Sequence, residues 1–102
     1  MPDECEQGAP IIQGPIQVSP PVVAPGQQIR IQVIVVGQAS IAAVFANGMP
    51  LTNRGGMLWE DNIPADREAG PQTVYALAKD ANGHIATHIG VYEVRREQKA
   101  HR

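Results

Sequence analysis

The sequence has few of the residues that define several common protein classes. It holds one cysteine, so no disulfide can form within the chain. Three leucines stand against twenty valines and isoleucines, and nine prolines and ten glycines are spread among them, which argues against a helical bundle. The formal charge of −2 lacks the basic excess of a nucleic-acid-binding module. The 102 residues therefore predict one β-rich domain.

Long apolar runs and a leader segment are also missing. The longest apolar run of the first half, from Val33 to Val36, is far too short to cross a bilayer, so we expect no membrane insertion. Met1 is followed by acidic residues instead of a basic segment and an apolar core, so the pattern predicts no signal peptide. The chain is then either a cytoplasmic protein or a piece of a longer one.

Charge is nearly absent from the first half. Between Gln7 and Trp59 only Arg30 and Arg54 carry charge, whereas residues 1–6 are acidic and residues 95–102 are mainly basic. A neutral surface resists association less well than a charged one. Two interpretations stay open: a domain surface covered by glutamines, or a surface that packs against another chain.

Alternation of polar and apolar residues gives the clearest strand. From Gln28 onwards the pattern places Ile29, Ile31, Val33 and Val35 on one face. Ile34 and Val36 break the alternation, because they would point outward together with two polar residues. The outward set is therefore a candidate interaction surface, made of Arg30, Gln32, Ile34 and Val36.

Turn residues separate the other strands. Asn47-Gly48 between apolar runs predicts a hairpin, because both residues tolerate positive φ. Gly14-Pro15 and Ser19-Pro20-Pro21 place the first strand at a sheet edge, because proline cannot donate to a ladder. Asp80 is expected to cap the turn that ends at Gly83.

About seven such strands predict an all-β, antiparallel sandwich over residues 11–94, with a disordered tip at 1–10 and a charged tail at 95–102. The predicted core is Val18, Ile29, Ile31, Val33, Val35, Val44, Trp59, Val74, Ala76, Ala78, Ile85 and Ile89.

Several segments resemble bacterial immunoglobulin-like and fibronectin-III-like modules over residues 16–94. They are Pro25-Gly26-Gln27-Gln28 before the first clear strand, the stretch from Val44 to Leu51, Leu58-Trp59-Glu60, and the stretch from Ala78 to His84. The resemblance implies an immunoglobulin-like sandwich used for adhesion, spacing or assembly on surface proteins, extracellular enzymes or phage virions. It implies no catalysis.

Few residues suggest chemistry. His84 and His88 would lie about 13 Å apart on a strand, too far to share one zinc ion. Asp80 and Asn82 with Glu60-Asp61 offer calcium-type oxygen ligands, although the turn needs Asp80 in any case. We expect no metal, no cofactor and no enzymatic activity, and a small-molecule ligand is not favoured.

Two single residues leave alternatives open. Trp59 either fills the core or forms an exposed platform for a sugar. Cys5 is interpreted as a free thiol, with a lipid anchor as the alternative.

The function predicted from these observations is a non-catalytic interaction or spacer module that contacts a protein or itself. It would belong to a larger bacterial secreted or cell-surface protein and act in adhesion or protein–protein contact. The alternatives are a self-assembling or phage virion structural subunit and a carbohydrate-binding accessory module.

Overall fold

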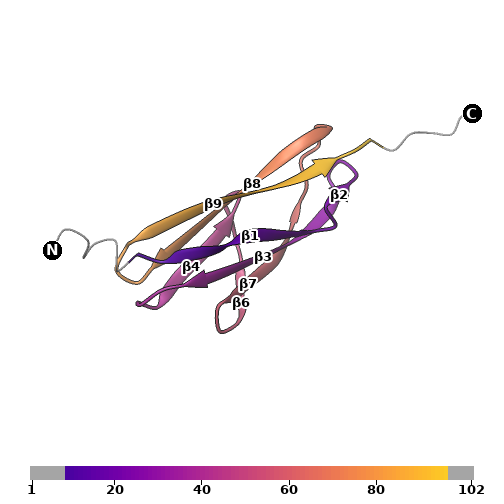
Figure 1. Cartoon of the computed structure of the whole chain (residues 1–102). Helices are drawn as coiled ribbons and strands as arrows, with labels where there is room; N and C mark the ends of the chain where they lie inside the picture. Colours follow the sequence, from indigo (N-terminus) through magenta and orange to yellow (C-terminus); the bar gives the residue numbers. More distant parts are fainter. Residues whose placement is uncertain (1–8, 97–102) are drawn as a thin grey trace, which may run out of the picture.

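A computed structural model describes residues 9–96, and the regular secondary structure of this part is all β (Figure 1). The strands are β1 (Ile11–Ser19), β2 (Val22–Val23), β3 (Gln28–Val36), β4 (Ile41–Ala46), β5 (Met49–Pro50), β6 (Thr52–Gly55), β7 (Leu58–Pro64), β8 (Gly70–Asp80) and β9 (Ile85–Val94). Residues 9–96 contain no helix that is long and apolar enough to cross a membrane.

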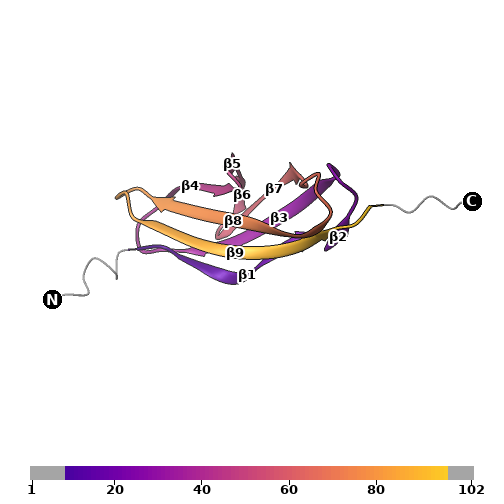
Figure 2. The same ribbon diagram turned by 90° about the horizontal axis from the view of Figure 1, so that it is seen from above.

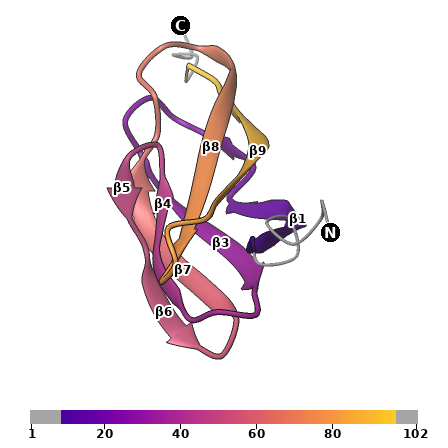
Figure 3. The same cartoon turned by 90° about the vertical axis from the view of Figure 1, so that its left-hand side faces the viewer.

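The strands form two sheets packed face to face (Figures 2 and 3). One sheet has four strands in the order β1-β3-β7-β6, and the other has five in the order β2-β9-β8-β4-β5. All pairings are antiparallel except the short one between β2 and β9. The predicted all-β, immunoglobulin-like sandwich is therefore confirmed, with seven longer strands and two of two residues each.

The core between the sheets contains most of the predicted residues. The predicted residues of β3, β4 and β8 are all buried: Ile29, Ile31, Val33, Val35, Val44, Val74, Ala76 and Ala78. Val18 and Trp59 are partly buried and pack against this cluster. Sequence reasoning left out nine further members: Ile12, Ile16, Val23, Ala46, Leu51, Ile63, Ala65, Tyr92 and Val94.

The last strand is oriented opposite to the prediction. Ile85 and Ile89 were expected in the core, but they are 55% and 60% exposed. Gly90, Tyr92 and Val94 point inward instead. The reason is the close approach of β1: a Cβ on Gly90 would lie 3.0 Å from the Cβ of Ile16. Only a small residue fits on the inward side at position 90, so the alternating set that contains Gly90, Tyr92 and Val94 faces inward and the set that contains Ile85 and Ile89 faces outward.

The predicted edge position of the first strand and the predicted hairpin turn are confirmed. β1 lies at a sheet edge, and its pairing with β3 shifts register between Gln13 and Gln17, around Pro15. Asn47 and Gly48 have φ values of 51° and 81°, as a tight hairpin turn requires. Most of the predicted tip, including Cys5, and most of the predicted tail lie outside the described residues.

Candidate interaction site

The outer face of the four-stranded sheet carries the predicted interaction surface. Arg30, Gln32, Ile34 and Val36 alternate along β3 with its buried residues and therefore share the outer face, as expected. Arg30 is exposed, whereas the other three are partly covered by their neighbours. The structure thus brings the four residues together, in a polar half and an apolar half.

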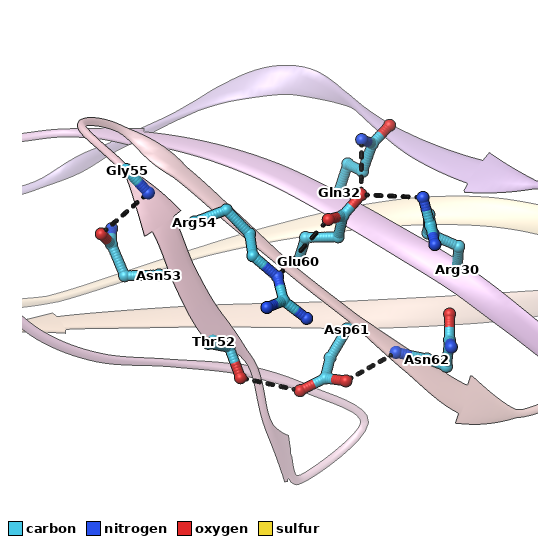
Figure 4. Close-up of polar contacts among 9 residues, drawn as sticks. All are labelled: Arg30, Gln32, Thr52, Asn53, Arg54, Gly55, Glu60, Asp61 and Asn62. Atoms are coloured by element: carbon cyan, nitrogen blue, oxygen red, sulfur yellow. Dashed lines mark hydrogen bonds and ion pairs between the residues drawn. The ribbon is translucent and has the colours of Figure 1, made fainter.

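Glu60 of β7 organises the polar half (Figure 4). Gln32 Nε2 donates to Glu60 Oε2 at 2.7 Å, and Arg30 Nη1 lies 3.5 Å from the same oxygen. Arg54 Nε, from β6, lies 3.5 Å from Glu60 Oε1. The Glu60 side chain is only 14% exposed, so these contacts replace part of the hydrogen bonding that water would give its carboxylate. The network ties three strands together.

This network engages Arg30 and Gln32, the two polar residues of the predicted interaction surface. Sequence reasoning missed Glu60 and Arg54 as members of the surface. Gln32 lies opposite Glu60 in the β3–β7 pairing. This register between two strands cannot be read from the alternation within either strand.

Asp61, the residue after Glu60 in β7, has a structural role (Figure 4). Its Oδ1 accepts from the backbone N–H of Asn62 at 3.0 Å, and its Oδ2 accepts from Thr52 Oγ1 at 2.9 Å. The Asn62 bond and then the Thr52 bond lower the pKa of this carboxyl, with a smaller contribution from the charge of Arg54, against a raising effect of burial. Asp61 is thereby kept ionised and fixed to β6.

The apolar half of the face is partly covered. Ile34 pairs with Leu58 of β7, and Val36 pairs with Ile11 of β1, which is 61% exposed. The apolar half therefore continues from Ile34 and Val36 onto apolar side chains of the two neighbouring strands.

The outer face of the five-stranded sheet is more apolar. Four of its large side chains are exposed: Tyr75 by 47%, Ile85 by 55%, Ile89 by 60% and Val91 by 70%. Tyr75 lies directly opposite Ile89 in the β8–β9 pairing. Phe45 and Leu77 continue the surface across β4 and β8, where they are paired and half-buried.

Charge lies at the two ends of this face. Lys79 pairs with Ile85 at one end, and Glu93 pairs with Pro71 at the other, where it also contacts Arg95 Nη2 at 3.2 Å. The outward positions of β8 and β9 between these ends are Thr73, Tyr75, Leu77, Thr87, Ile89 and Val91. We call these six residues, with Ile85 and Phe45, the apolar face. Sequence reasoning missed it because β9 was assigned the wrong orientation.

Asp80 is a buried acid in the β8–β9 turn. Its Oδ1 accepts from the backbone N–H groups of Asn82 and His84, each at 2.9 Å, and its Oδ2 lies 3.1 Å from His84 Nδ1. Burial is the largest single influence on the pKa of Asp80 and raises it. The hydrogen bonds from His84 and Asn82 together outweigh burial, so the pKa of Asp80 is lowered. The expected cap is confirmed.

The candidate metal ligands do not converge. Asp80 lies in the β8–β9 turn, whereas Glu60 and Asp61 lie on β7 of the opposite sheet. His84 contacts Asp80, and His88 lies farther along β9, beside Gly14. Within residues 9–96 no three His, Cys, Asp or Glu side chains are grouped so that they could hold a metal ion.

Trp59 faces the core from the middle of the four-stranded sheet. It pairs with Val33, whose side chain is buried, and packs against the core cluster while staying partly exposed. This position favours the core role over an exposed platform.

Comparison with solved structures gives a match at the level of the fold. The chain is similar to the structure described as fibronectin(III)-like modules of Clostridium thermocellum CbhA, with a TM-score of 0.58 and 15% sequence identity. The match covers 90% of this chain and 53% of the other, so the chain spans about half the length of the solved chain it matches. No family model and no curated protein matches the sequence. The chain thus has the fold of a fibronectin-III-like module, as its motifs suggested.

Proposed function

We propose that the chain is a non-catalytic interaction and spacer module of a longer secreted or cell-surface protein, and that it contacts a protein partner through the apolar face. The observation that carries this proposal is the exposure of Tyr75, Ile85, Ile89 and Val91 together on one sheet face. Contiguous exposed apolar side chains on a soluble domain mark contact sites, because removing them from water stabilises the complex.

The use of the carboxylates supports a non-catalytic role. Glu60 is held by Gln32 and two arginines, Asp61 by Thr52 and its neighbour, and Asp80 by its own turn. Each of these acids is engaged in cross-strand or turn contacts and not directed at a shared cleft. Acid–base catalysis needs a positioned group that is available to a substrate.

The path of the chain supports the spacer part of the proposal. β1 begins at one end of the sandwich, and β9 finishes at the opposite end (Figures 1 and 2). Segments that continue from the two ends would leave in opposite directions, so domains on either side would be held apart by the length of the module.

The face with Arg30, Gln32, Ile34 and Val36 is a second candidate for partner contact. Its polar half is already bonded within the domain, so a partner there would compete with the Glu60 network. The carbohydrate-binding alternative has less support, because Tyr75 is the one exposed aromatic side chain among residues 9–96.

Site-specific photo-crosslinking in the source cells tests the contact. A photoreactive phenylalanine analogue is placed at Tyr75, at Ile89 and, as a control on the other sheet, at Arg54. We expect a discrete adduct from positions 75 and 89 and none from position 54, because only the first two lie on the apolar face.

The identity of the adduct separates the proposals. At position 75, an adduct with a different protein supports the interaction module, whereas an adduct with a second copy of the chain favours the self-assembling subunit. Adducts of equal strength from all three positions, or none from 75 and 89, would overturn the role given to the apolar face.

A further inference from the structure

β9 is paired along its whole length on one edge and only at its last two residues on the other, within the described part of the chain. Residues Ile85–Val94 all pair with β8. On the other edge β2 pairs only with Glu93 and Val94. Among residues 9–96, the stretch from Ile85 to Val91 has no backbone partner on that second edge. This stretch is the open edge of β9.

The direction of the open N–H groups follows from the contacts with the β2 segment. The N–H of Glu93 donates to Pro21 O at 2.9 Å, and the N–H of Arg95 donates to Val23 O at 2.8 Å. Alternate residues of a strand direct their N–H and C=O to the same edge. The N–H and C=O groups of Ile85, Thr87, Ile89 and Val91 therefore point away from β8, while the intervening residues bond to it.

The open edge lacks the features that keep sheet edges from pairing. Edge strands of soluble proteins usually carry charge, proline or bulges, or are very short. β1 contains Pro15 and a register shift, β2 and β5 have two residues each, and β6 is short, shifted and contains Arg54. Ile85–Val91 contains no charged Lys, Arg, Asp or Glu and no proline.

Beyond the partner contact proposed above, we infer that the open edge pairs with the same edge of a second copy, so that the two five-stranded sheets become continuous. With His88 opposite His88 on a two-fold axis, Ile85 faces Val91 of the second copy and Thr87 faces Ile89. Each such pair exchanges two backbone hydrogen bonds, so every unpaired group of the open edge is used.

The side chains at the open edge suit this pairing. The four residues whose backbones would bond are isoleucine, threonine, isoleucine and valine, all β-branched, and cross-strand pairs of such residues stabilise a sheet. No Lys, Arg, Asp or Glu side chains meet along this stretch. The outward positions of β9 belong to the apolar face, so pairing would join the two apolar faces into one surface. β1 packs against β9 at two points, with Ile16 beside Gly90 and Gly14 beside His88, but it makes no backbone hydrogen bond to this stretch within residues 9–96.

Hydrogen exchange resolved by residue tests the inference directly, together with sedimentation of the full chain over a wide range of concentration. We expect a monomer–dimer equilibrium. The amides of Ile85, Thr87, Ile89 and Val91 should gain protection, by about tenfold or more, as the dimer forms. The amides of Ala86, His88 and Gly90 should be protected throughout, because they bond to β8.

Two variants separate the edge from the face. Ile89→Pro removes one N–H of the open edge without removing a bond to β8, so it should give a monomer under conditions where the original chain is a dimer. Thr87→Lys, which places charge at the edge, is the second variant if the proline prevents folding. Tyr75→Lys, on the apolar face but away from the edge, should leave the dimer intact.

Three results would overturn the inference. They are a monomer at every concentration, a dimer abolished by Tyr75→Lys but kept by Ile89→Pro, and protection of all four amides in the dilute monomer, which would mean that the chain covers its own edge. None of them alters the crosslinks expected from position 75 to a different protein, so this inference and the proposed function fail separately.

Discussion

At the scale of single residues, Asp80 shows how a buried charge is retained. Its carboxylate is almost completely buried, yet two backbone N–H groups and the His84 ring surround it. Buried carboxylates are tolerated when hydrogen bonds satisfy them. The side chain therefore acts as the fixed centre of the β8–β9 turn, and its replacement should reveal how much the turn depends on it.

We predict that Asp80→Ala lowers the melting temperature by several degrees and that Asp80→Asn costs much less. Asparagine keeps one oxygen for the N–H groups of Asn82 and His84, whereas alanine leaves both without a partner. Thermal unfolding followed by circular dichroism measures the difference. Equal losses in the two variants would show that the charge, and not the acceptor, holds the turn.

The lowered pKa of Asp80 and Asp61 predicts the direction of the pH dependence. Both carboxyls have a pKa below the ordinary 3.8 in the folded chain. Their contribution to stability is therefore complete above about pH 4 and is lost as the pH falls through the lowered values. Urea unfolding at several pH values should show a loss of stability below pH 4 that is weaker in Asp80→Asn. A loss on raising the pH from 4 to 6 would contradict this sign.

Gly90 is a second residue whose role follows from a close approach. A Cβ there would lie 3.0 Å from the Cβ of Ile16 and 3.4 Å from its Cγ2. We predict that Gly90→Ala destabilises the fold by about 1–3 kcal/mol in urea unfolding. Ile16→Val should not relieve the strain, because valine keeps both atoms. Unchanged stability in Gly90→Ala would mean that β1 moves away without cost.

At the scale of elements, the β4–β5 hairpin is fixed by its turn and by one side chain. Asn47 Oδ1 accepts from the N–H of Tyr75 at 2.8 Å, and the N–H of Asn47 donates to Tyr75 O at 2.9 Å. Asn47 thus continues the pairing of β8 past the end of β4, while its own backbone has a positive φ. One residue supplies both the turn and the ladder.

We predict that Asn47→Ala destabilises the domain by about 1–2 kcal/mol, because alanine loses the acceptor and is strained at positive φ. Asn47→Asp keeps an acceptor oxygen and tolerates this conformation, so it serves as the matched control. Chemical unfolding followed by Trp59 fluorescence measures both variants. A loss in Asn47→Asp as large as that in Asn47→Ala would contradict the role given to the side-chain oxygen.

The elements also show which parts of the fold the sequence could predict. β3 alternates strictly over its first six residues, from Gln28 to Val33, and its inward face was predicted correctly. The inward residues of β8 were predicted correctly as well. β9 has apolar residues at both alternating sets of positions, and the choice between them depends on how near β1 comes to Gly90. The Glu60 network depends on the register between β3 and β7. Distances between strands decide both features, and local patterns do not contain them.

At the scale of the whole molecule, the two outer faces differ in chemistry. One is tied together by Glu60 and its partners, and the other presents the apolar face. The first half of the sequence is poor in charge, yet four of the exposed large apolar side chains lie together on β8 and β9, in the second half. A surface with few charged residues therefore does not have to expose many apolar side chains. Hydrogen bonds and side chains of neighbouring strands can cover part of such a surface.

The spacer role predicts a fixed separation between the two ends of the sandwich. β9 has ten residues, which corresponds to about 33 Å of strand, and β1 begins near one end of it while β9 finishes at the other (Figure 1). Dyes attached at positions 11 and 95 should therefore give one narrow distribution in single-molecule energy transfer, centred at about 30 Å. Unfolding in urea should broaden it, because an unfolded chain samples many separations.

The distribution should not change when globular domains are fused to both ends, because the hydrogen-bonded sheets and not the flanking segments set the distance. A separation below about 15 Å, or a broad distribution in the native protein, would mean that flanking domains are not held apart, and the spacer role would have to be abandoned.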